Sequence, residues 1–396
     1  MKYFLIAGEA SGDLHASHLI TALRVADAEA TFVGFGGDLM QASGMRLLRH
    51  YKHTAFMGFV QVLRHLPTIV RAMRQCRRAL QEECPDAVIL IDYPGFNLRM
   101  ARYATELGLP VYYYIAPKVW AWKEGRVAQI KRYVKRVYSI LPFEVDFFQK
   151  RHGLMAHYVG NPTAEEVAAY RATHVDDSVE RLHAEGLVDS TRPIIALLAG
   201  SRKHEVRDNL PHMYRAARPY ISQGYQVVIS VAPDLSEPYY KALLAAEGLL
   251  PEGEAHISLL PHAAHRLMHL ATIALVTSGT ATLETALFGT PQIVCYYTPL
   301  PWLVGWLRKA FLKVKYVSLV NLVADAPIVP ELVADTFCPA SLAYHLAALL
   351  PEGQARQAQR EGYRCIAERL GTMPAAERTA ELLLLHLAED VQSSDA

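Results

Sequence analysis

Residues 193–206 read PIIALLAGSRKHEV, an apolar run that leads through a glycine turn into a helical pattern. The run 193–198 has the length and composition of a buried strand. Small residues, a hydroxyl and an arginine follow it at Ala199-Gly200-Ser201-Arg202. A helix N-terminus offers unpaired backbone N–H groups, and glycine lets an anion approach them closely. This strand, turn and helix therefore predict a site for phosphate.

A second turn of the same kind follows the apolar run 273–276. It reads Ser278-Gly279-Thr280, with Glu284 expected in the first turn of the next helix. Arg202 can pair its planar guanidinium with two phosphate oxygens at once, and the Glu284 carboxylate can accept hydrogen bonds from ribose hydroxyls. Either turn alone is also an ordinary N-cap. Two of them in successive units of one half favour a nucleotide diphosphate as the ligand.

Short strand-like runs alternate with longer amphipathic stretches, a pattern that predicts parallel βα units. The chain of 396 residues is long enough for two cores. Two Rossmann-like halves are expected, with the boundary near 160–190 and ligands in the cleft between the halves. The expected domains are 1–165, joined by C-terminal helices from about 365–390, and 166–364. The expected strands are 3–7, 31–34, 87–91, 111–115, 137–141 and 157–159 in the first half, and 193–198, 226–231, 256–259, 273–276 and 292–296 in the second.

Asp92 is the candidate general base. It follows the almost wholly apolar run 87–91, and function gathers at the carboxyl end of a parallel strand. A partly desolvated carboxylate there can accept a proton from an attacking sugar hydroxyl, although an aspartate before Tyr93-Pro94 is as commonly a turn cap. The first glycine turn, GEASGD (8–13), lacks the spacing of a dinucleotide site. Its polar side chains suit a polyhydroxylated acceptor, while Asp13 is also placed to cap the following helix.

Two segments combine apolar and basic side chains. Residues 57–80 hold five arginines and no acid, and residues 299–314 have a similar composition. Such stretches can place apolar side chains in a lipid interface while their arginines meet anionic headgroups, although a helix with a solvated basic face is commoner. The expected membrane contacts are Met57, Phe59, Val60, Leu63, Arg64, Leu66, Ile69, Arg71 and Arg74.

Composition limits the class of protein. The net charge of +1 argues against a nucleic-acid ligand, yet residues 1–160 hold 21 Lys and Arg against 13 Asp and Glu, so this part is expected to face an anion. Five scattered cysteines fit a reducing cytosol, and no run of roughly 18 uncharged apolar residues could span a bilayer. His262, His265 and His269 can share a helix face, but no carboxylate or cysteine in that run completes a ligand set. No metal and no cofactor is predicted.

Nine motifs run in order along most of the chain: GEASGD (8–13), GFGGDLM (34–40), MGFVQVL (57–63), IDYPGFN (91–97), PKVWAWKEGRV (117–127), LPFE (141–144), GSRKHEV (200–206), SGTATLE (278–284) and YVSLVNL (316–322). They resemble those of the lipid-A-disaccharide synthases, glycosyltransferase family 19. The resemblance implies a GT-B fold, with the parallel sheets of two Rossmann-like domains facing across a cleft, and a metal-independent, inverting transfer. The implied reaction joins UDP-2,3-diacylglucosamine to 2,3-diacylglucosamine 1-phosphate (lipid X), releasing UDP and forming the β-1,6-linked lipid A disaccharide 1-phosphate.

The resemblance implies a role for individual residues. The general base falls on Asp92 and the phosphate-contacting arginine on Arg202. The protein is implied to be cytoplasmic and peripherally attached to an anionic inner-membrane surface, and the resemblance allows a homodimer with exchanged C-terminal segments. The chain departs from the family at Gly95, Ala199 and Val320, where relatives often have an acid, a proline and a proline. The residues implied for the UDP donor are Ser201, Ser278, Gly279, Thr280, Glu284 and Asn321, and those for the acceptor are Glu9, Ser11 and Asp13.

Two other functions fit the residues. A UDP-N-acetylglucosamine 2-epimerase shares the two-domain architecture and the diphosphate site, but it converts its UDP-sugar without an acceptor and needs no membrane segment. A non-catalytic nucleotide-sugar-binding protein would bind UDP and be indifferent to the loss of Asp92.

Overall fold

The computed structural model describes residues 1–53, 66–250, 258–277, 279–297 and 315–392, which form two α/β units. The first unit comprises Met1–Pro162 with Thr372–Ala396, and the second is Thr163–Gly371. The chain therefore returns to the first unit at Thr372, a few residues later than the expected return at about 365. Residues 365–371 belong to the second unit because helix α18 (Arg356–Leu370) continues to the buried Leu370.

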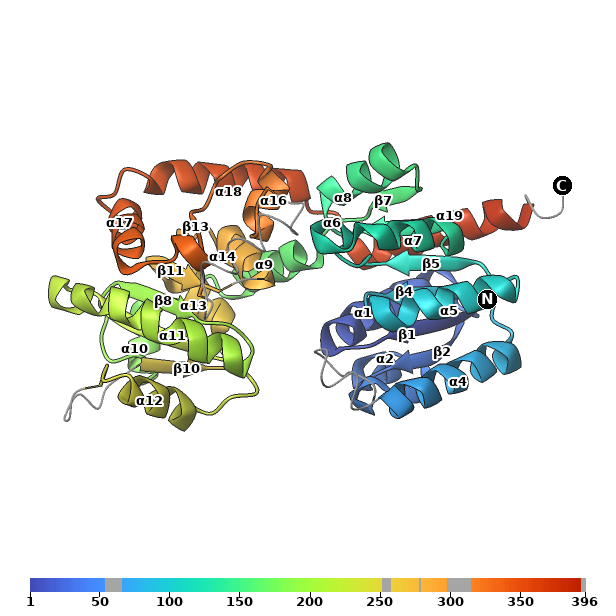
Figure 1. Ribbon diagram of the computed structural model, residues 1–396, viewed down its shortest axis with the longest axis horizontal. Coiled ribbons are helices and arrows are strands. Elements are labelled where there is room, and N and C mark those ends of the chain that lie inside the picture. The colour runs from blue at the N-terminus through green and yellow to red at the C-terminus, as the bar shows by residue number, and fades with distance from the viewer. Residues whose placement is uncertain (54–65, 251–257, 278, 298–314, 393–396) are drawn as a thin grey trace. The chain divides into compact units, whose positions relative to one another are not determined.

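The first unit is built on a seven-stranded parallel sheet in the order β3-β2-β1-β4-β5-β6-β7, with helices on both faces (Figure 1). Its strands are β1 (Lys2–Ala7), β2 (Thr31–Gly36), β3 (Arg46–His50), β4 (Ala87–Ile91), β5 (Val111–Tyr114), β6 (Arg136–Ser139) and β7 (Ala156–Tyr158). Its helices are α1 (Ala10–Ala26), α2 (Asp38–Ala42), α4 (Leu66–Glu83), α5 (Pro94–Glu106), α6 (Val119–Trp122), α7 (Val127–Tyr133), α8 (Pro142–Asp146) and α19 (Ala375–Gln392), with single turns at Tyr51–His53, Glu124–Arg126 and Phe147–Arg151.

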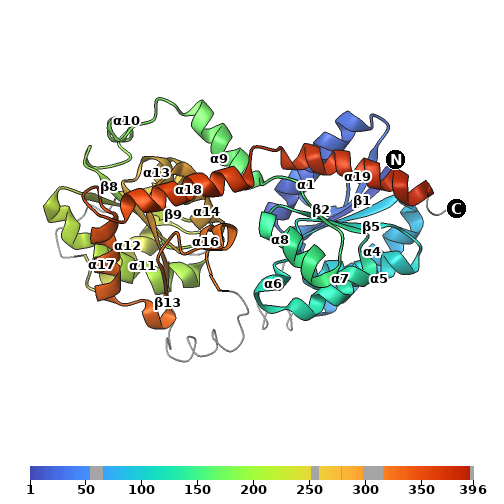
Figure 2. The same ribbon diagram turned by 90° about the horizontal axis from the view of Figure 1, so that it is seen from above.

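The side chains of β1 alternate between two apolar cores. Phe4 and Ile6 pack with residues of α4, α5 and α7 on one face of the sheet. Tyr3 and Leu5 pack on the other face with α1 and with Leu383 of α19. Helices α1 and α19 lie side by side on this second face (Figure 2). The C-terminal helix therefore completes the core of the N-terminal unit.

The second unit has a six-stranded parallel sheet in the order β10-β9-β8-β11-β12-β13. Alternate residues of β8 again divide between two cores, with Ile195 and Leu197 facing α11, α12 and α17, and Ile194 and Ala196 facing α9, α10, α13 and α14. The strands are β8 (Ile194–Leu198), β9 (Gln226–Val231), β10 (Ser258–Pro261), β11 (Ile273–Val276), β12 (Gln292–Tyr296) and β13 (Glu331–Val333). The helices are α9 (Pro162–Thr173), α10 (Val179–Ala184), α11 (Lys203–Ala217), α12 (Glu237–Ala246), α13 (Ala264–Leu270), α14 (Thr280–Phe288), α16 (Leu319–Ala324), α17 (Pro339–Leu349) and α18, with short turns at Arg218–Gln223 and Ala334–Thr336.

The structure confirms the expected alternation of strands and helices in both units. Strands β4, β9, β11 and β12 have the expected bounds, and the other expected strands differ by one or two residues at their ends. Two strands were not expected, β3 and β13. Both lie at a sheet edge, and their sequences RLLRH and ELV are too short and too polar at their ends to read as apolar runs. Within the described ranges, no helix has the length and apolar character needed to cross a membrane.

The strand order reverses at one point in each sheet, between β1 and β4 in the first unit and between β8 and β11 in the second. Ligands of open parallel sheets bind beyond the carboxyl ends of the strands at this point. The residues that follow the two strand pairs are Glu9 and Asp92 in the first unit, and Arg202 and Thr277 with their neighbours in the second.

Candidate functional site

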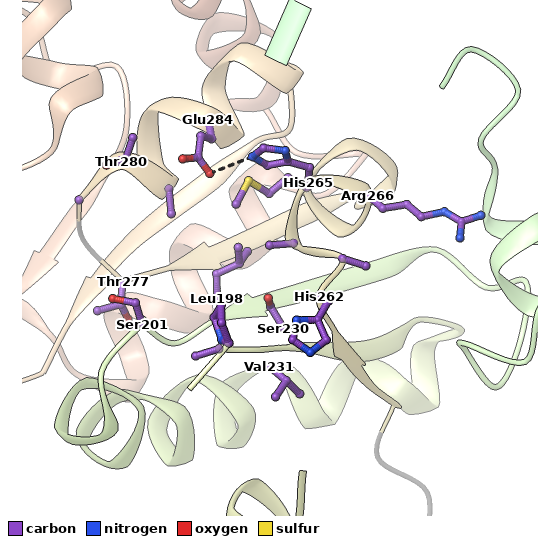
Figure 3. A pocket seen from close by; sticks show the side chains of 18 of the residues that line it. Leu198, Ser201, Ser230, Val231, His262, His265, Arg266, Thr277, Thr280 and Glu284 are labelled. Carbon is purple, nitrogen blue, oxygen red and sulfur yellow. Dashed lines mark ion pairs between the residues drawn. The ribbon is translucent and has the colours of Figure 1, made fainter. Parts of the chain in front are cut away.

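A cavity of about 900 Å³ opens where the strand order of the second unit reverses. Its lining comes from the loops that follow β8, β9, β10 and β11 and from α13 and α14 (Figure 3). A cavity of this size can hold a nucleotide sugar. Ser278 lies outside the described residues. The structure brings together here five residues expected at the donor, which are Ser201, Arg202, Gly279, Thr280 and Glu284.

The turn after β8 already holds a carboxylate. Oε2 of Glu205 accepts hydrogen bonds from the backbone N–H groups of Ser201 (3.0 Å) and Arg202 (3.3 Å). Nη1 of Arg202 donates to Oε1 of Glu205 at 3.3 Å. Gly200 has a φ of +117°, and a Cβ there would lie 2.6 Å from Cβ of Glu205. Glycine is therefore required at this position, and the amides of the turn are arranged to bind an oxyanion.

The turn after β11 leads directly into α14, with Gly279 as its N-cap and Thr280 as its first residue. Gly279 has a φ of +79°, while a Cβ there would meet nothing within 4 Å. Backbone conformation, and not lack of space, therefore favours glycine. Glu284 is the fifth residue of α14, so the expectation that it lies in the first helical turn was wrong. Because Glu284 lies beyond the first turn, the N-terminal amides of α14 remain available to another anion.

Glu284 is paired with a histidine at the edge of the cavity. Oε2 of Glu284 lies 3.6 Å from Nε2 of His265 on α13, as the dashed line in Figure 3 marks. The His265 ring packs edge-on against Tyr170 (centroids 5.7 Å apart) and against Phe288 (5.6 Å). The adjacent Glu284 carboxylate raises the pKa of His265, and the charge of Glu166 on α9 raises it further. One carboxylate oxygen of Glu284 is thus engaged by a ring held between two aromatic side chains.

The other two histidines of this run have separate surroundings. His262 directly follows β10, has a φ of +54° and lines the cavity. His269 packs against Tyr170 and Phe288, and burial lowers its pKa. Over the ranges that the structure describes, no group of three or more His, Cys, Asp or Glu is placed to hold a metal ion.

Asn321 does not belong to this cavity. Its side chain is 1% exposed and forms hydrogen bonds with the segment that leads into β13. Nδ2 donates to the carbonyl of Val329 and to Oε1 of Glu331, and Oδ1 accepts from the Val329 N–H, each at 2.9 Å. Asn321 instead borders a separate hollow of about 590 Å³ beside Tyr316. Its hydrogen bonds give it a structural role in joining α16 to β13.

In the first unit, Asp92 lies at the carboxyl end of β4 in a strained backbone conformation. Asp92 (φ +41°) and Tyr93 (φ +48°) are both left-handed, which non-glycine residues rarely adopt. The Asp92 carbonyl accepts hydrogen bonds from Nδ2 of Asn97 (2.7 Å) and from the hydroxyl of Tyr113. A Cβ on Gly8 would lie 2.2 Å from the Tyr93 ring, so the glycine turn after β1 makes room for this conformation. The surrounding residues thus fix the backbone from which the Asp92 carboxyl group projects.

Burial raises the pKa of the Asp92 carboxyl to about 6, and the negative charge of Glu9 raises it as well. The charge of Lys118 and the backbone N–H of Tyr93 act in the opposite direction. Asp92 is therefore more basic than an ordinary aspartate but still mainly ionised at neutral pH. That combination is suited to a general base.

The three residues expected at the acceptor are divided by the structure. The Ser11 hydroxyl donates to Oε1 of Glu9 at 2.8 Å, so these two stay together near Asp92. Asp13 is 3% exposed, and its carboxylate accepts hydrogen bonds from the N–H groups of Gly37 (2.8 Å), Leu39 (3.1 Å) and Met40 (3.1 Å). Asp13 therefore holds the start of α2, and it does not cap α1, the helix that the sequence offered as the alternative.

Glu144 is a second carboxylate that the sequence did not single out. It is 2% exposed, accepts a hydrogen bond from Nε1 of Trp120 at 2.8 Å, and accepts another from the Ser139 hydroxyl. Burial raises its pKa to about 7, and the charge of Asp92 acts in the same direction. The only trace of it in the sequence is LPFE (141–144), which places an acid in the first turn of α8, the helix that follows β6.

Four of the expected membrane contacts lie on the described helix α4. Leu66, Arg71 and Arg74 are exposed, and Ile69 is half-buried. The opposite side of α4 packs into the core through residues such as Cys76. The remaining five, Met57, Phe59, Val60, Leu63 and Arg64, lie outside the described residues, and so does the whole of 299–314.

Comparison with known proteins gives consistent matches over nearly the whole chain. A family model described as lipid-A-disaccharide synthetase matches residues 3–383. The lipid-A-disaccharide synthase of Myxococcus xanthus is 36% identical over 385 residues, covering 97% of each chain. That of Acidobacterium capsulatum is 37% identical over 378 residues, covering 93% of this chain and 92% of the other.

Among solved structures, a UDP-N-acetylglucosamine 2-epimerase described as putative, from Listeria monocytogenes, superimposes with a TM-score of 0.65. It is 13% identical and covers 98% of this chain and 97% of its own. The glycotransferase of kitacinnamycin superimposes with a TM-score of 0.61 at 12% identity, covering 98% and 99%. These likenesses establish the fold, two parallel-sheet Rossmann-like domains of the GT-B type.

Proposed function

The chain belongs to the lipid-A-disaccharide synthetase family of glycosyltransferases, and from that premise we propose the reaction in detail. The enzyme transfers 2,3-diacylglucosamine from its UDP donor to the 6-hydroxyl of 2,3-diacylglucosamine 1-phosphate. The products are UDP and the β-1,6-linked disaccharide 1-phosphate. The observation that carries the proposal is the cavity of the second unit, where two glycine turns, Arg202 and Glu284 line one space.

The second unit is proposed to bind the donor nucleotide. Its two turns offer backbone N–H groups to the diphosphate, and Arg202, whose side chain is 57% exposed, offers its guanidinium. Negative charge builds on the diphosphate as the glycosidic bond breaks, and these groups stabilise it. Glu205 holds the same amides before the nucleotide arrives, so a phosphate oxygen replaces its carboxylate. Glu284 accepts hydrogen bonds from the ribose hydroxyls while His265 holds its other oxygen.

The first unit is proposed to bind the acceptor and to supply the base. The 6-oxygen of the acceptor attacks the anomeric carbon, its proton passes to the Asp92 carboxylate, and the bond to UDP breaks on the opposite face. A single displacement of this kind converts the α-linked donor into a β-linked product. The pKa of about 6 supports this role because Asp92 is ionised at neutral pH and still basic enough to take the proton.

Helix α4 is proposed to contact the anionic surface from which the acylated substrates are drawn. Its exposed side has Arg71, Arg74 and Arg78 and no acidic residue before Glu82. Arg77 is not counted among these membrane contacts, because its guanidinium lies over the Tyr103 ring, 4.1 Å from the ring centroid. Each arginine near an anionic bilayer contributes about 1 kcal/mol to binding, and each buried methylene about 0.8 kcal/mol.

The test of the proposed reaction is UDP release from UDP-2,3-diacylglucosamine in detergent, with and without 2,3-diacylglucosamine 1-phosphate. Release that depends on the acceptor supports the transfer. Conversion of the UDP-sugar without an acceptor would favour an epimerase, the activity named for the Listeria monocytogenes protein whose fold this chain shares. Tight UDP binding with no reaction under either condition would leave a nucleotide-sugar-binding protein.

A further inference from the structure

Thr277 has a buried hydroxyl that no neighbour satisfies. It is the residue directly after β11, it is 3% exposed, and it lines the cavity of the second unit. Its backbone N–H donates to the carbonyl of Leu198 at 2.8 Å, so the main chain is held in the sheet. Its Oγ1 has no hydrogen-bond partner among the residues that the structure describes. A buried hydroxyl left in this state costs free energy, and such groups call for a specific reason.

Other buried threonines of the same unit differ from Thr277. The hydroxyl of Thr282 donates to the Gly279 carbonyl at 2.9 Å, and that of Thr285 donates to the Ala281 carbonyl at 2.7 Å. The hydroxyl of Thr290 donates to the Met268 carbonyl at 2.6 Å. The packing of this unit thus satisfies threonine hydroxyls where it can. The hydroxyl of Thr277 is the one among these four that faces the cavity with its donor unused.

The place of Thr277 indicates which part of a ligand it meets. Strands β8 and β11 are neighbours, with Val276 beside Leu198 in the register. The anion-binding turn that contains Ser201 follows β8. The turn that contains Gly279 follows β11, and Gly279 is two residues after Thr277 in the sequence. Thr277 therefore lies where the two turns begin, and Figure 3 labels it and Ser201 among the residues that line the cavity. This is the part of the cavity that suits phosphate, whereas Glu284 and His265 lie further along α14 and α13.

We propose that the Thr277 hydroxyl donates a hydrogen bond to a phosphate oxygen of the nucleoside diphosphate bound in this cavity, which makes Thr277 a substrate-binding residue. The inference rests on the proposed function, in which the cavity takes the UDP end of the donor. Hydrogen bonds to an ionised oxygen are about twice as strong as neutral ones. The ligand thus provides the acceptor that the protein itself does not.

The test compares Thr277→Val, which has nearly the same shape without the hydroxyl, with wild type for binding of UDP and of uridine. The expected result is a loss of UDP affinity of about 10- to 100-fold with an unchanged affinity for uridine, which has no phosphate. The melting temperature of the unliganded variant should equal or exceed that of wild type, because an unsatisfied polar group has been removed. Thr277→Ser keeps the hydroxyl and should restore UDP affinity.

The matched control is Thr290→Val. Thr290 is buried to the same degree as Thr277, at 4% exposed, but its hydroxyl is paired. This change should lower the melting temperature and leave UDP affinity unaltered.

Two results would overturn the assignment of Thr277. One is equal UDP affinity of wild type and Thr277→Val, and the other is a parallel loss for UDP and uridine, which would place the hydroxyl at the nucleoside. Failure of wild type itself to bind UDP would remove the proposed function together with this inference, so the two failures are distinguishable.

Discussion

Nε2 of His265 lies 3.6 Å from Oε2 of Glu284, and the two side chains belong to consecutive helices, α13 and α14. Glu284 borders the cavity in which the donor nucleotide is proposed to bind. The stability of the second unit depends on pH through this pair, because the ion pair exists only while His265 is protonated. The pKa of His265 is raised by the adjacent Glu284 carboxylate and by the charge of Glu166.

His265→Asn should lower the melting temperature at pH 6 and have a smaller effect at pH 9. A histidine whose pKa is raised on folding contributes stability that is fully present below its unfolded pKa of 6.5 and is lost as the pH rises through the folded value. The control is His269→Asn, because burial lowers the pKa of His269 and its protonation disfavours the fold at low pH. Equal losses for His265→Asn at both pH values would contradict the role given to the pair.

Glu9→Gln should move the acidic limb of the pH profile of kcat/KM to lower pH. The negative charge of Glu9 is one of the causes that raise the pKa of Asp92, so a neutral side chain lets Asp92 ionise earlier. Ser11→Ala removes the hydroxyl that donates to Glu9 without changing any charge and should leave the limb nearly in place. A limb that stays near pH 6 in Glu9→Gln would show that the two carboxylates are not coupled.

Asp92→Asn should raise the melting temperature at pH 8 by a few degrees and have less effect at pH 4.5. The pKa of Asp92 is raised from 3.8 to about 6 mainly by burial, so its ionised form costs stability once the pH exceeds the folded value. Asparagine also accepts the left-handed backbone of this position. A melting temperature that falls at pH 8 would mean that the Asp92 charge has a stabilising partner.

Arg71→Glu with Arg74→Glu should reduce sedimentation of the protein with vesicles of phosphatidylethanolamine and phosphatidylglycerol by at least about tenfold in binding constant. Both side chains are exposed on α4. The matched control reverses two exposed arginines on α18, Arg360 and Arg364, and should bind as wild type does. Equal binding of the two double variants would remove α4 from the proposed membrane surface.

The fold was predictable because every interior strand is a short apolar run between helical patterns. The run AVILI (87–91), for example, is buried at each residue and marks β4 without ambiguity. Strands β3 and β13 were not predictable, because the basic residues in RLLRH and the shortness of ELV leave no apolar run to recognise. The late return of the chain to the first unit depends on where α18 ends, which local sequence does not determine.

The candidate site was predictable where a residue type that suits a phosphate directly follows the end of a predicted strand. Arg202 and Thr280 follow strand ends, and the cavity brings them together. Asp13 and Asn321 have residue types that suit a ligand, but their hydrogen bonds to distant backbone groups become visible only in the fold. Glu144 and Thr277 required burial to be known, because a single acid or hydroxyl after a strand carries no distinctive signal.

The most direct test of the account is the single-turnover rate of Asp92→Asn against wild type at pH 7.5, with UDP affinity measured on the same preparations. If Asp92 takes the proton of the acceptor hydroxyl, the rate falls by about 10²- to 10⁴-fold while UDP affinity is retained. A near-normal rate with retained UDP affinity would contradict the assignment of Asp92 as the general base.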